Sequence, residues 1–397
     1  MLGVLLAAIH FTGQLQDQTE LQVLGVSGST ATTWNFATTP SVDLTAAWGR
    51  WTLGLQYALV VTGRTLEQSP SVDLLQRGDF SLLWRGRRWR VALDERASLG
   101  TVNYATAATS APGAPTPALQ ALPMNTTLFT VSSRSSLTLS ARLTRRLEGA
   151  IYGGWSLSGG VDAAALAVVP LQSGPIGGAR ANYTLSQQDL LEGTLDFTRV
   201  QFSETACTSA PTSVGVTSSA RCTPRDDLAM LQLGLRHRFT RTTEATLRAG
   251  AAVAGTQSSA GAPYLLHAGP LVGATLAHRT RDVNAQTVYS FGAQLSSSVA
   301  QQTGAIDRRL QGDASVEWTS QRLILRASAR ASQSIPFDVS GAYLVTNMET
   351  SVGVQLDRYV TVSLGERIDW QRYASGQSFV AVLGFLRVQV ASRRIQF

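Results

Sequence analysis

Apolar and polar residues alternate along most of the chain, in segments of about 10 to 14 residues that begin near Thr19. In residues 51–61 every second position is apolar, and these positions are Trp51, Leu53, Leu55, Tyr57, Leu59 and Val61. The same period recurs in residues 80–84, 89–93, 191–197, 314–318 and 323–329. Successive side chains of a strand point to opposite faces, so this pattern predicts β-strands with one apolar face and one polar face.

Short and long connections between these segments alternate along the chain. The short connections are eight tight turns at residues 49–50, 85–88, 144–146, 187–189, 240–243, 279–282, 319–320 and 357–358. The connections between them are longer and rich in Pro, Gly, Ser and Thr, and the longest are 101–126 and 203–226. Hairpins at these turns, with one more strand at each end of the chain, predict about 18 strands.

Composition narrows the fold class further. The chain has 397 residues, of which 44% are hydrophobic and 15% are charged, whereas soluble domains have roughly 25% charged residues. Apolar runs such as 163–169 are far shorter than the ~18 residues of a membrane-spanning helix. Strands in hydrocarbon must pair all their backbone groups, so the sheet has to close. We therefore expect an all-β chain that forms a single closed antiparallel transmembrane β-barrel over residues 19–397. A large soluble sandwich or solenoid is the alternative.

With this plan the chain resembles bacterial outer-membrane β-barrels of the porin type. The resemblance implies the bacterial outer membrane as location, with short periplasmic turns and longer extracellular loops. Such barrels usually end on an aromatic residue, as Phe397 does here. Ile395 is the only other apolar residue in its alternating set, and a bulge near Ala391 would restore the phase.

Two regions are expected to differ from the barrel wall. Residues 1–18 begin with an apolar stretch, which is either the remnant of a secretory signal or a short periplasmic segment. The two cysteines, Cys207 and Cys222, share one polar loop, which predicts a disulfide and an oxidising compartment. Two free thiols are the alternative.

The polar faces of the strands would line the lumen. The lumen-lining candidates are Arg77, Arg88, Arg90, Asp94, Arg96, Asp313, Glu317, Arg322, Arg326 and Arg330. A two-residue turn at 319–320 would place Glu317 opposite Arg322 and Asp313 opposite Arg326. Such pairs either stiffen the wall or belong to an arginine row that favours anions. Glu366 shares the apolar register of its strand, so either the strand bulges there or the carboxylate meets a partner.

Aromatic and basic residues gather where strands meet turns. The aromatic residues expected at the membrane interface are Trp48, Trp51, Trp84, Trp89 and Trp318, for which a role as ordinary core residues is the alternative. Arginines at the tight turns would ring the periplasmic mouth, where a periplasmic partner could dock: Arg50, Arg85, Arg87, Arg145, Arg146, Arg241, Arg279, Arg281 and Arg358.

The sequence offers no catalytic or metal-binding motif. The four histidines, His10, His237, His267 and His278, do not combine with a nucleophile or show metal-ligand spacing. We therefore expect no enzyme activity, no metal and no cofactor. The net charge is +7, but basic runs with interleaved aromatics are absent, which argues against a nucleic-acid partner.

These features favour an outer-membrane channel, porin-like, through which small hydrophilic solutes diffuse passively in a water-filled lumen. The first alternative is polysaccharide export with periplasmic partners, because the chain also resembles the 18-stranded alginate-type exporters. The second alternative is a sealed structural barrel with a surface-binding loop. Outer-membrane lipid and lipopolysaccharide are the expected surroundings. The sequence indicates neither the solute nor an oligomeric state.

Overall fold

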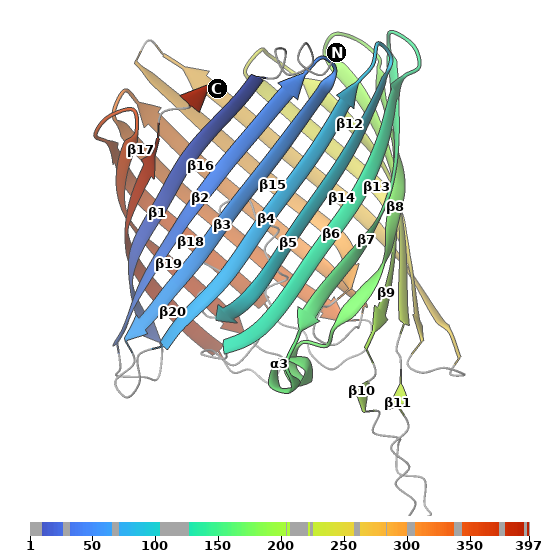
Figure 1. The fold of residues 1–397 in the computed structure, drawn as a ribbon. Helices are drawn as coiled ribbons and strands as arrows, with labels where there is room; N and C mark the ends of the chain where they lie inside the picture. The colour runs from blue at the N-terminus through green and yellow to red at the C-terminus, as the bar shows by residue number, and fades with distance from the viewer. Residues whose placement is uncertain are drawn as a thin grey trace, which may run out of the picture.

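The computed structural model describes residues 10–26, 32–65, 71–103, 127–203, 205–206, 221–222, 225–257, 263–282, 284–299, 306–336, 344–372, 378–392 and 395–396. Eighteen long strands form one closed antiparallel β-barrel (Figure 1), which confirms the predicted fold class and strand number. The barrel closes because the first strand, β1 (His10–Val26), pairs with β20 (Ser378–Ala391) near the end of the chain.

Each strand pairs with its neighbours along the chain, from β1 round to β20. The first half of the wall consists of β1, β2 (Thr32–Trp48), β3 (Trp51–Thr65), β4 (Ser71–Arg85), β5 (Trp89–Asn103), β6 (Thr127–Arg142), β7 (Leu147–Gly160), β8 (Gln172–Thr184) and β9 (Asp189–Phe202). The second half consists of β12 (Arg225–Arg238), β13 (Thr243–Gln257), β14 (Leu265–Arg281), β15 (Ala285–Val299), β16 (Ile306–Ser320), β17 (Leu323–Pro336), β18 (Leu344–Gln355), β19 (Val360–Arg372) and β20.

Three small elements and one short strand complete the fold. A small antiparallel pair of two-residue strands, β10 (Thr205–Ala206) and β11 (Arg221–Cys222), lies between β9 and β12 and is called the β10–β11 hairpin. The helix α3 (Ala163–Val168) follows β7, and the Asp162 carboxylate caps it by accepting from the Ala165 N–H at 2.7 Å. The strand β21 (Ile395–Gln396) continues β20. No helix among the described residues is long and apolar enough to cross a membrane.

The two ends of the barrel differ in their connections. The eight short turns all lie at one end, which we call the turn end, and both ends of the described chain lie there too (Figure 1). The longer connections, with α3 and the β10–β11 hairpin, lie at the opposite end, which we call the loop end. The tightest hairpin pairs Trp48 with Trp51, and Gly49 adopts a φ of 55° there, which glycine tolerates without steric cost.

The turn between β16 and β17 corrects the predicted register. The turn consists of Gln321 and Arg322, whereas residues 319–320 still belong to β16. In the structure Glu317 lies opposite Arg326 and Asp313 lies opposite Arg330, so the predicted partners were wrong. The faces were right, because a turn displaced by two residues moves each partner by an even number of positions and side chains alternate with a period of two.

The barrel begins earlier in the chain than the alternation predicted. Because β1 starts at His10, residues 10–18 are part of the wall rather than of a separate N-terminal segment, and residues 1–9 lie outside the described part. The period-two pattern is hidden here because Asp17 occupies a position in the apolar set, between Leu15 and Thr19. The predicted boundary at residue 19 therefore moves to His10.

The expected bulge near Ala391 is present. Ala391 pairs with Gln16 and Ile395 pairs with Gly13, so four steps along the C-terminal strand are matched by three along β1. The extra residue brings Ile395 into the register of Leu15, on the apolar face. Ser392 stabilises the irregularity, since its Oγ accepts from the Leu15 N–H at 2.9 Å and its own N–H donates to the Leu15 carbonyl at 2.7 Å. Phe397 itself lies outside the described residues.

Candidate functional site in the barrel lumen

Each strand presents one set of side chains to the outside and the alternate set to the lumen. Nearly all large apolar side chains exposed within the strands belong to the outer set, for example Leu195, Leu231, Leu233, Leu247 and Leu364. Such an apolar band is the surface that a membrane-spanning barrel turns to lipid. The alternate set carries most of the charged, hydroxyl and amide side chains, and it forms the wall of the lumen.

Side chains on the lumen wall are buried near the loop end and exposed to solvent near the turn end. Most of the buried lumen-facing side chains lie in the half of each strand next to the long connections, and they include Val60, Leu75, Leu128, Val200, Leu228, Ala254, Leu271 and Val345. Arg90 on β5 and Arg326 on β17, near the turn end, are by contrast 62% and 56% exposed. The lumen is therefore accessible from the turn end and lined by buried side chains toward the loop end.

Ion pairs join neighbouring strands across the exposed part of the lumen wall. The Arg326 Nε donates to Glu317 Oε2 at 3.1 Å, and the Arg96 Nε lies 3.8 Å from Asp79 Oδ1. Further round the wall Glu192 lies 2.7 Å from Arg236 and 3.6 Å from Arg248. Arginines and carboxylates thus alternate on the wall, so the lumen has charges of both signs rather than a single-sign field.

Uncharged hydrogen-bonding side chains fill the spaces between these pairs. On β1 the lumen-facing set contains Gln14, Gln16 and Gln18. Hydroxyl and amide pairs connect adjacent strands: Ser98 with Ser132 at 2.8 Å, Ser290 with Ser315 at 2.6 Å and Gln294 with Gln311 at 3.4 Å. Only charged residues were predicted from the sequence to line the lumen, although the same alternation assigns these amides and hydroxyls to it as well.

Two buried ion pairs lie where the barrel closes. The Arg387 Nε on β20 donates to Glu20 Oε2 on β1 at 2.8 Å. On β19 the Arg367 Nε lies 3.0 Å from Asp369 Oδ2. All four face the lumen, and the guanidinium carbon of Arg387 lies 4.7 Å from the ring centroid of buried Phe385. The pair between Glu20 and Arg387 links the first and last strands and stabilises their register, whereas the pair between Arg367 and Asp369 lies within β19.

Most of the predicted lumen residues lie on the lumen wall. Those in the strands are Arg77, Arg90, Asp94, Arg96, Asp313, Glu317, Arg326 and Arg330. Arg88 and Arg322 instead lie in turns, so their assignment to the wall was wrong. Arg322 lies in a turn that comes two residues later than the sequence pattern indicated, whereas Arg88 lies within the tight turn at 85–88 that the pattern itself predicted. The predicted interface tryptophans lie at the turn end on the outer set: Trp48, Trp51, Trp84, Trp89 and Trp318.

Acidic residues also occur in the outer set. Glu366 lies there without a bulge, because β19 pairs without interruption with both neighbours, and the Thr350 hydroxyl donates to its carboxylate at 3.4 Å. The sequence pattern allowed either a bulge or a partner for Glu366, and the structure shows that the partner is the Thr350 hydroxyl. Asp17, in the same set, accepts from Thr38 at 2.9 Å and from Thr19 at 3.2 Å.

The described histidines lie apart from one another. His237 Nδ1 lies 2.7 Å from Asp189 Oδ1, and His278 Nδ1 lies 2.7 Å from the Thr243 hydroxyl, both at the turn end. In the described ranges no three His, Cys, Asp or Glu side chains form a group that could hold a metal ion. Cys207 and the side chain of Cys222 lie outside the described part of the chain, so the disulfide stays a prediction.

Solved structures with a similar fold are bacterial outer-membrane proteins, in agreement with the resemblance that the sequence indicated. The FrpB iron transporter from Neisseria meningitidis (F5-1 variant) is 10% identical with a TM-score of 0.53, over 90% of this chain and 63% of that chain. OccK2 (OpdF) from Pseudomonas aeruginosa, in complex with glucuronate, is 11% identical with a TM-score of 0.48, over 96% of this chain and 98% of that chain. The likeness to FrpB shows the barrel fold.

Sequence comparison assigns the family. No curated protein matches the chain. The family model described as the EpsX exopolysaccharide export family matches residues 18–389, from the middle of β1 almost to the end of β20. Since this match spans nearly the whole barrel, the chain belongs to the EpsX exopolysaccharide export family.

Proposed function

We propose that the barrel spans the bacterial outer membrane and lets an exopolysaccharide pass through its lumen to the cell surface. The family match and the apolar outer face support this proposal. In this orientation the turn end faces the periplasm, so the polymer enters where the lumen wall is exposed. It leaves toward the loop end, where the wall is buried.

The observation that carries the proposal is the chemistry of the lumen wall. Hydroxyl and amide side chains exchange hydrogen bonds with sugar hydroxyls, and water can bridge such contacts at little cost. Because the wall arginines pair with carboxylates, as Arg326 does with Glu317, the wall offers no strong field of one sign that would hold a polymer in place. Many weak, similar contacts allow a chain to bind and move on.

Passive diffusion of small solutes is the second candidate. The exposed charged wall at the turn end, including Arg90 and Arg326, would also admit water and ions. Export differs from diffusion in requiring delivery of the polymer to the periplasmic mouth. The arginines of the tight turns, such as Arg145 and Arg241, lie at that mouth and would bind an acidic surface of a periplasmic partner.

Secretion by the bacterium that encodes the protein tests the proposal. Deletion of the gene should abolish extracellular exopolysaccharide, and the wild-type gene should restore it. Ser132 and Ser133 are adjacent on β6 and lie on opposite faces, so they form a matched pair. Ser132→Trp places a bulky ring in the lumen and should lower secretion, whereas Ser133→Trp on the lipid face should secrete like the wild type.

Two outcomes would contradict export. Secretion that persists in the deletion strain would show that the polymer takes another route. Equal secretion by both serine variants, at equal amounts of folded protein in the outer membrane, would show that the lumen is not the passage.

A further inference from the structure

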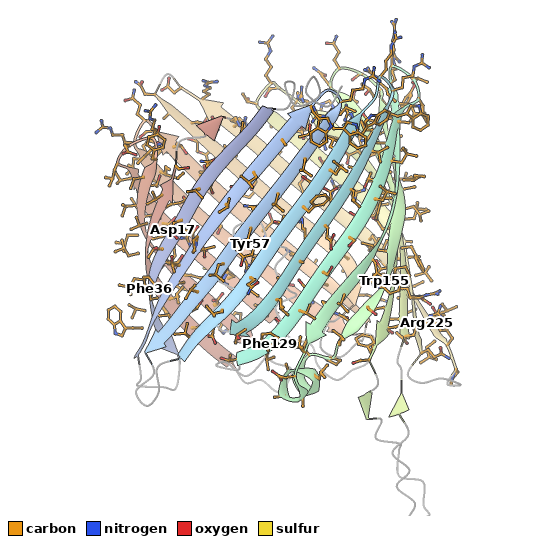
Figure 2. The ribbon with its side chains drawn as sticks, in the orientation of Figure 1. Asp17, Phe36, Tyr57, Phe129, Trp155 and Arg225 are labelled. Carbon is orange, nitrogen blue, oxygen red and sulfur yellow. The ribbon has the colours of Figure 1, made fainter. Side chains whose placement is uncertain are left out.

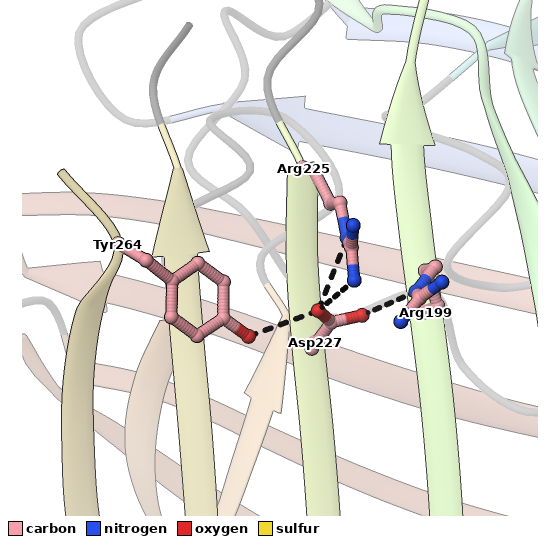
Figure 3. Close-up of polar contacts among 4 residues, drawn as sticks. All are labelled: Arg199, Arg225, Asp227 and Tyr264. Atoms are coloured by element: carbon pink, nitrogen blue, oxygen red, sulfur yellow. Dashed lines mark hydrogen bonds and ion pairs between the residues drawn. The ribbon is translucent and has the colours of Figure 1, made fainter. Parts of the chain in front are cut away.

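Four polar residues form a network on the outer face of the barrel at the loop end (Figure 3). Asp227 on β12 lies at its centre. Its Oδ1 accepts from the Arg199 Nε on β9 at 2.7 Å, and its Oδ2 accepts from the Arg225 Nη2 at 2.7 Å and Nε at 3.1 Å. The Tyr264 hydroxyl, just before β14, donates to the same Oδ2 at 2.9 Å. The network therefore fixes two guanidinium groups side by side.

The neighbouring strand is shaped to admit the tyrosine. Gly255 on β13 lies opposite Asp227, and a Cβ at Gly255 would lie only 2.0 Å from the Tyr264 hydroxyl oxygen. The Tyr264 ring therefore crosses β13 over the one position that has no side chain there. Partial burial and the hydrogen bond to Asp227 raise the pKa of Tyr264, so its hydroxyl keeps its proton and remains a donor near neutral pH.

The network lies at the edge of the apolar band. Arg225 and Asp227 share the outer register of Leu231, Leu233 and Leu235, all of which are exposed, and Figure 2 shows Arg225 near the loop end. From Asp227 to His237 the strand advances about 25 Å along the barrel axis, for a rise of ~3.3 Å per residue and a tilt of ~40°. This equals the height of the apolar band in membrane barrels, so the two arginines lie at the level of lipid headgroups.

The charge of the network is positive. Two arginines face one carboxylate, and Asp227 takes up only the Nε of Arg199 and the Nε and Nη2 of Arg225. The other guanidinium N–H groups are not used by Asp227, and the side chains of Arg199 and Arg225 are 36% and 34% exposed. Guanidinium groups held in this way match the oxygens of a phosphate group.

We propose that Arg199 and Arg225 bind a phosphate group of the phosphorylated glycolipid in the outer leaflet, that is, of lipopolysaccharide. Asp227 and Tyr264 orient the two guanidinium groups, and the exposed leucines below contact the acyl chains. The proposal concerns the outer face alone and does not depend on what passes through the lumen.

Native mass spectrometry of the purified protein in detergent micelles tests the site, with lipid A as the probe. The wild type should retain lipid A that carries both phosphates and should retain dephosphorylated lipid A much less. Arg225→Gln should weaken lipid A binding about tenfold or more, because it removes charge-assisted hydrogen bonds. Gly255→Ala, which leaves both arginines in place but displaces Tyr264, should weaken binding less than Arg225→Gln does.

A matched control carries the same charge change elsewhere. Arg241→Gln, in an exposed turn at the opposite end of the barrel, should bind lipid A like the wild type. Equal retention of both forms of lipid A, or equal binding by Arg225→Gln and Arg241→Gln, would overturn the proposal. Displacement of lipid A by millimolar inorganic phosphate would overturn it as well, since the site would then select free phosphate rather than the lipid.

Discussion

Two ion pairs on the lumen wall, Glu20 with Arg387 and Asp79 with Arg96, differ in how much their carboxylates contribute to the stability of the barrel. In the first pair the side chains of Glu20 and Arg387 are 4% and 16% exposed, whereas Arg96 and Asp79 form a long, exposed pair. Glu20→Ala removes the carboxylate that faces Arg387 in a buried place, and we expect a loss of about 3–5 kcal/mol in the free energy of unfolding. Asp79→Ala should cost about 1 kcal/mol or less.

Denaturant titrations of the refolded protein in detergent micelles, followed by tryptophan fluorescence, measure both values. Asp79→Ala is the matched control, because it also removes one carboxylate from a lumen-facing arginine. Similar shifts in the two variants would contradict the argument that burial decides the contribution.

At the scale of strands, the alternation of apolar and polar residues predicts which face of the sheet a side chain lies on. It predicts less well which residue lies opposite on the neighbouring strand. It placed Glu317 and Arg326 correctly on the lumen face but paired each with the wrong residue. A turn that is moved by two residues leaves every face unchanged, so the sequence pattern contains little information on such shifts. The start of β1 was missed for a related reason, since Asp17 interrupts the apolar set and its hydroxyl partner Thr38 comes from a strand pairing that the pattern does not show.

The bulge after Ala391 leads to a prediction about the last strand. Insertion of one alanine after Ser392 adds a second extra residue, so Ile395 would move opposite Thr12 in the lumen-facing register and a polar position would meet lipid. We expect a lower folded fraction, measured by the heat-dependent mobility of the barrel in gel electrophoresis. Ser392→Ala keeps the chain length and removes only the acceptor for the Leu15 N–H, so it should lower the folded fraction less. Equal losses in both variants would argue against a role for the register.

For the whole molecule, the sequence predicted a closed barrel because strands in hydrocarbon have no other way to pair their backbone groups. It did not predict the asymmetry of the lumen. The residues that show it, such as Leu271 and Val345, are apolar side chains in the lumen set, and their burial depends on contacts that alternation does not describe. The same limit applies to the cargo, because a wall of amides, hydroxyls and paired charges is compatible with more than one polar solute.

The ion preference of the lumen tests whether the exposed wall is part of the pathway. Arg326→Glu replaces one positive charge by a negative charge and leaves Glu317 without its partner across the strands. In planar bilayers under a salt gradient, the reversal potential of this variant should shift toward cation preference, because permeating ions respond to charges that line the lumen. Arg372→Glu makes the same charge change on the outer register of β19 and should leave the reversal potential unchanged. An unchanged potential in Arg326→Glu would show that ions do not pass along this part of the wall, and the lumen face of β17 would then have to be assigned a structural role.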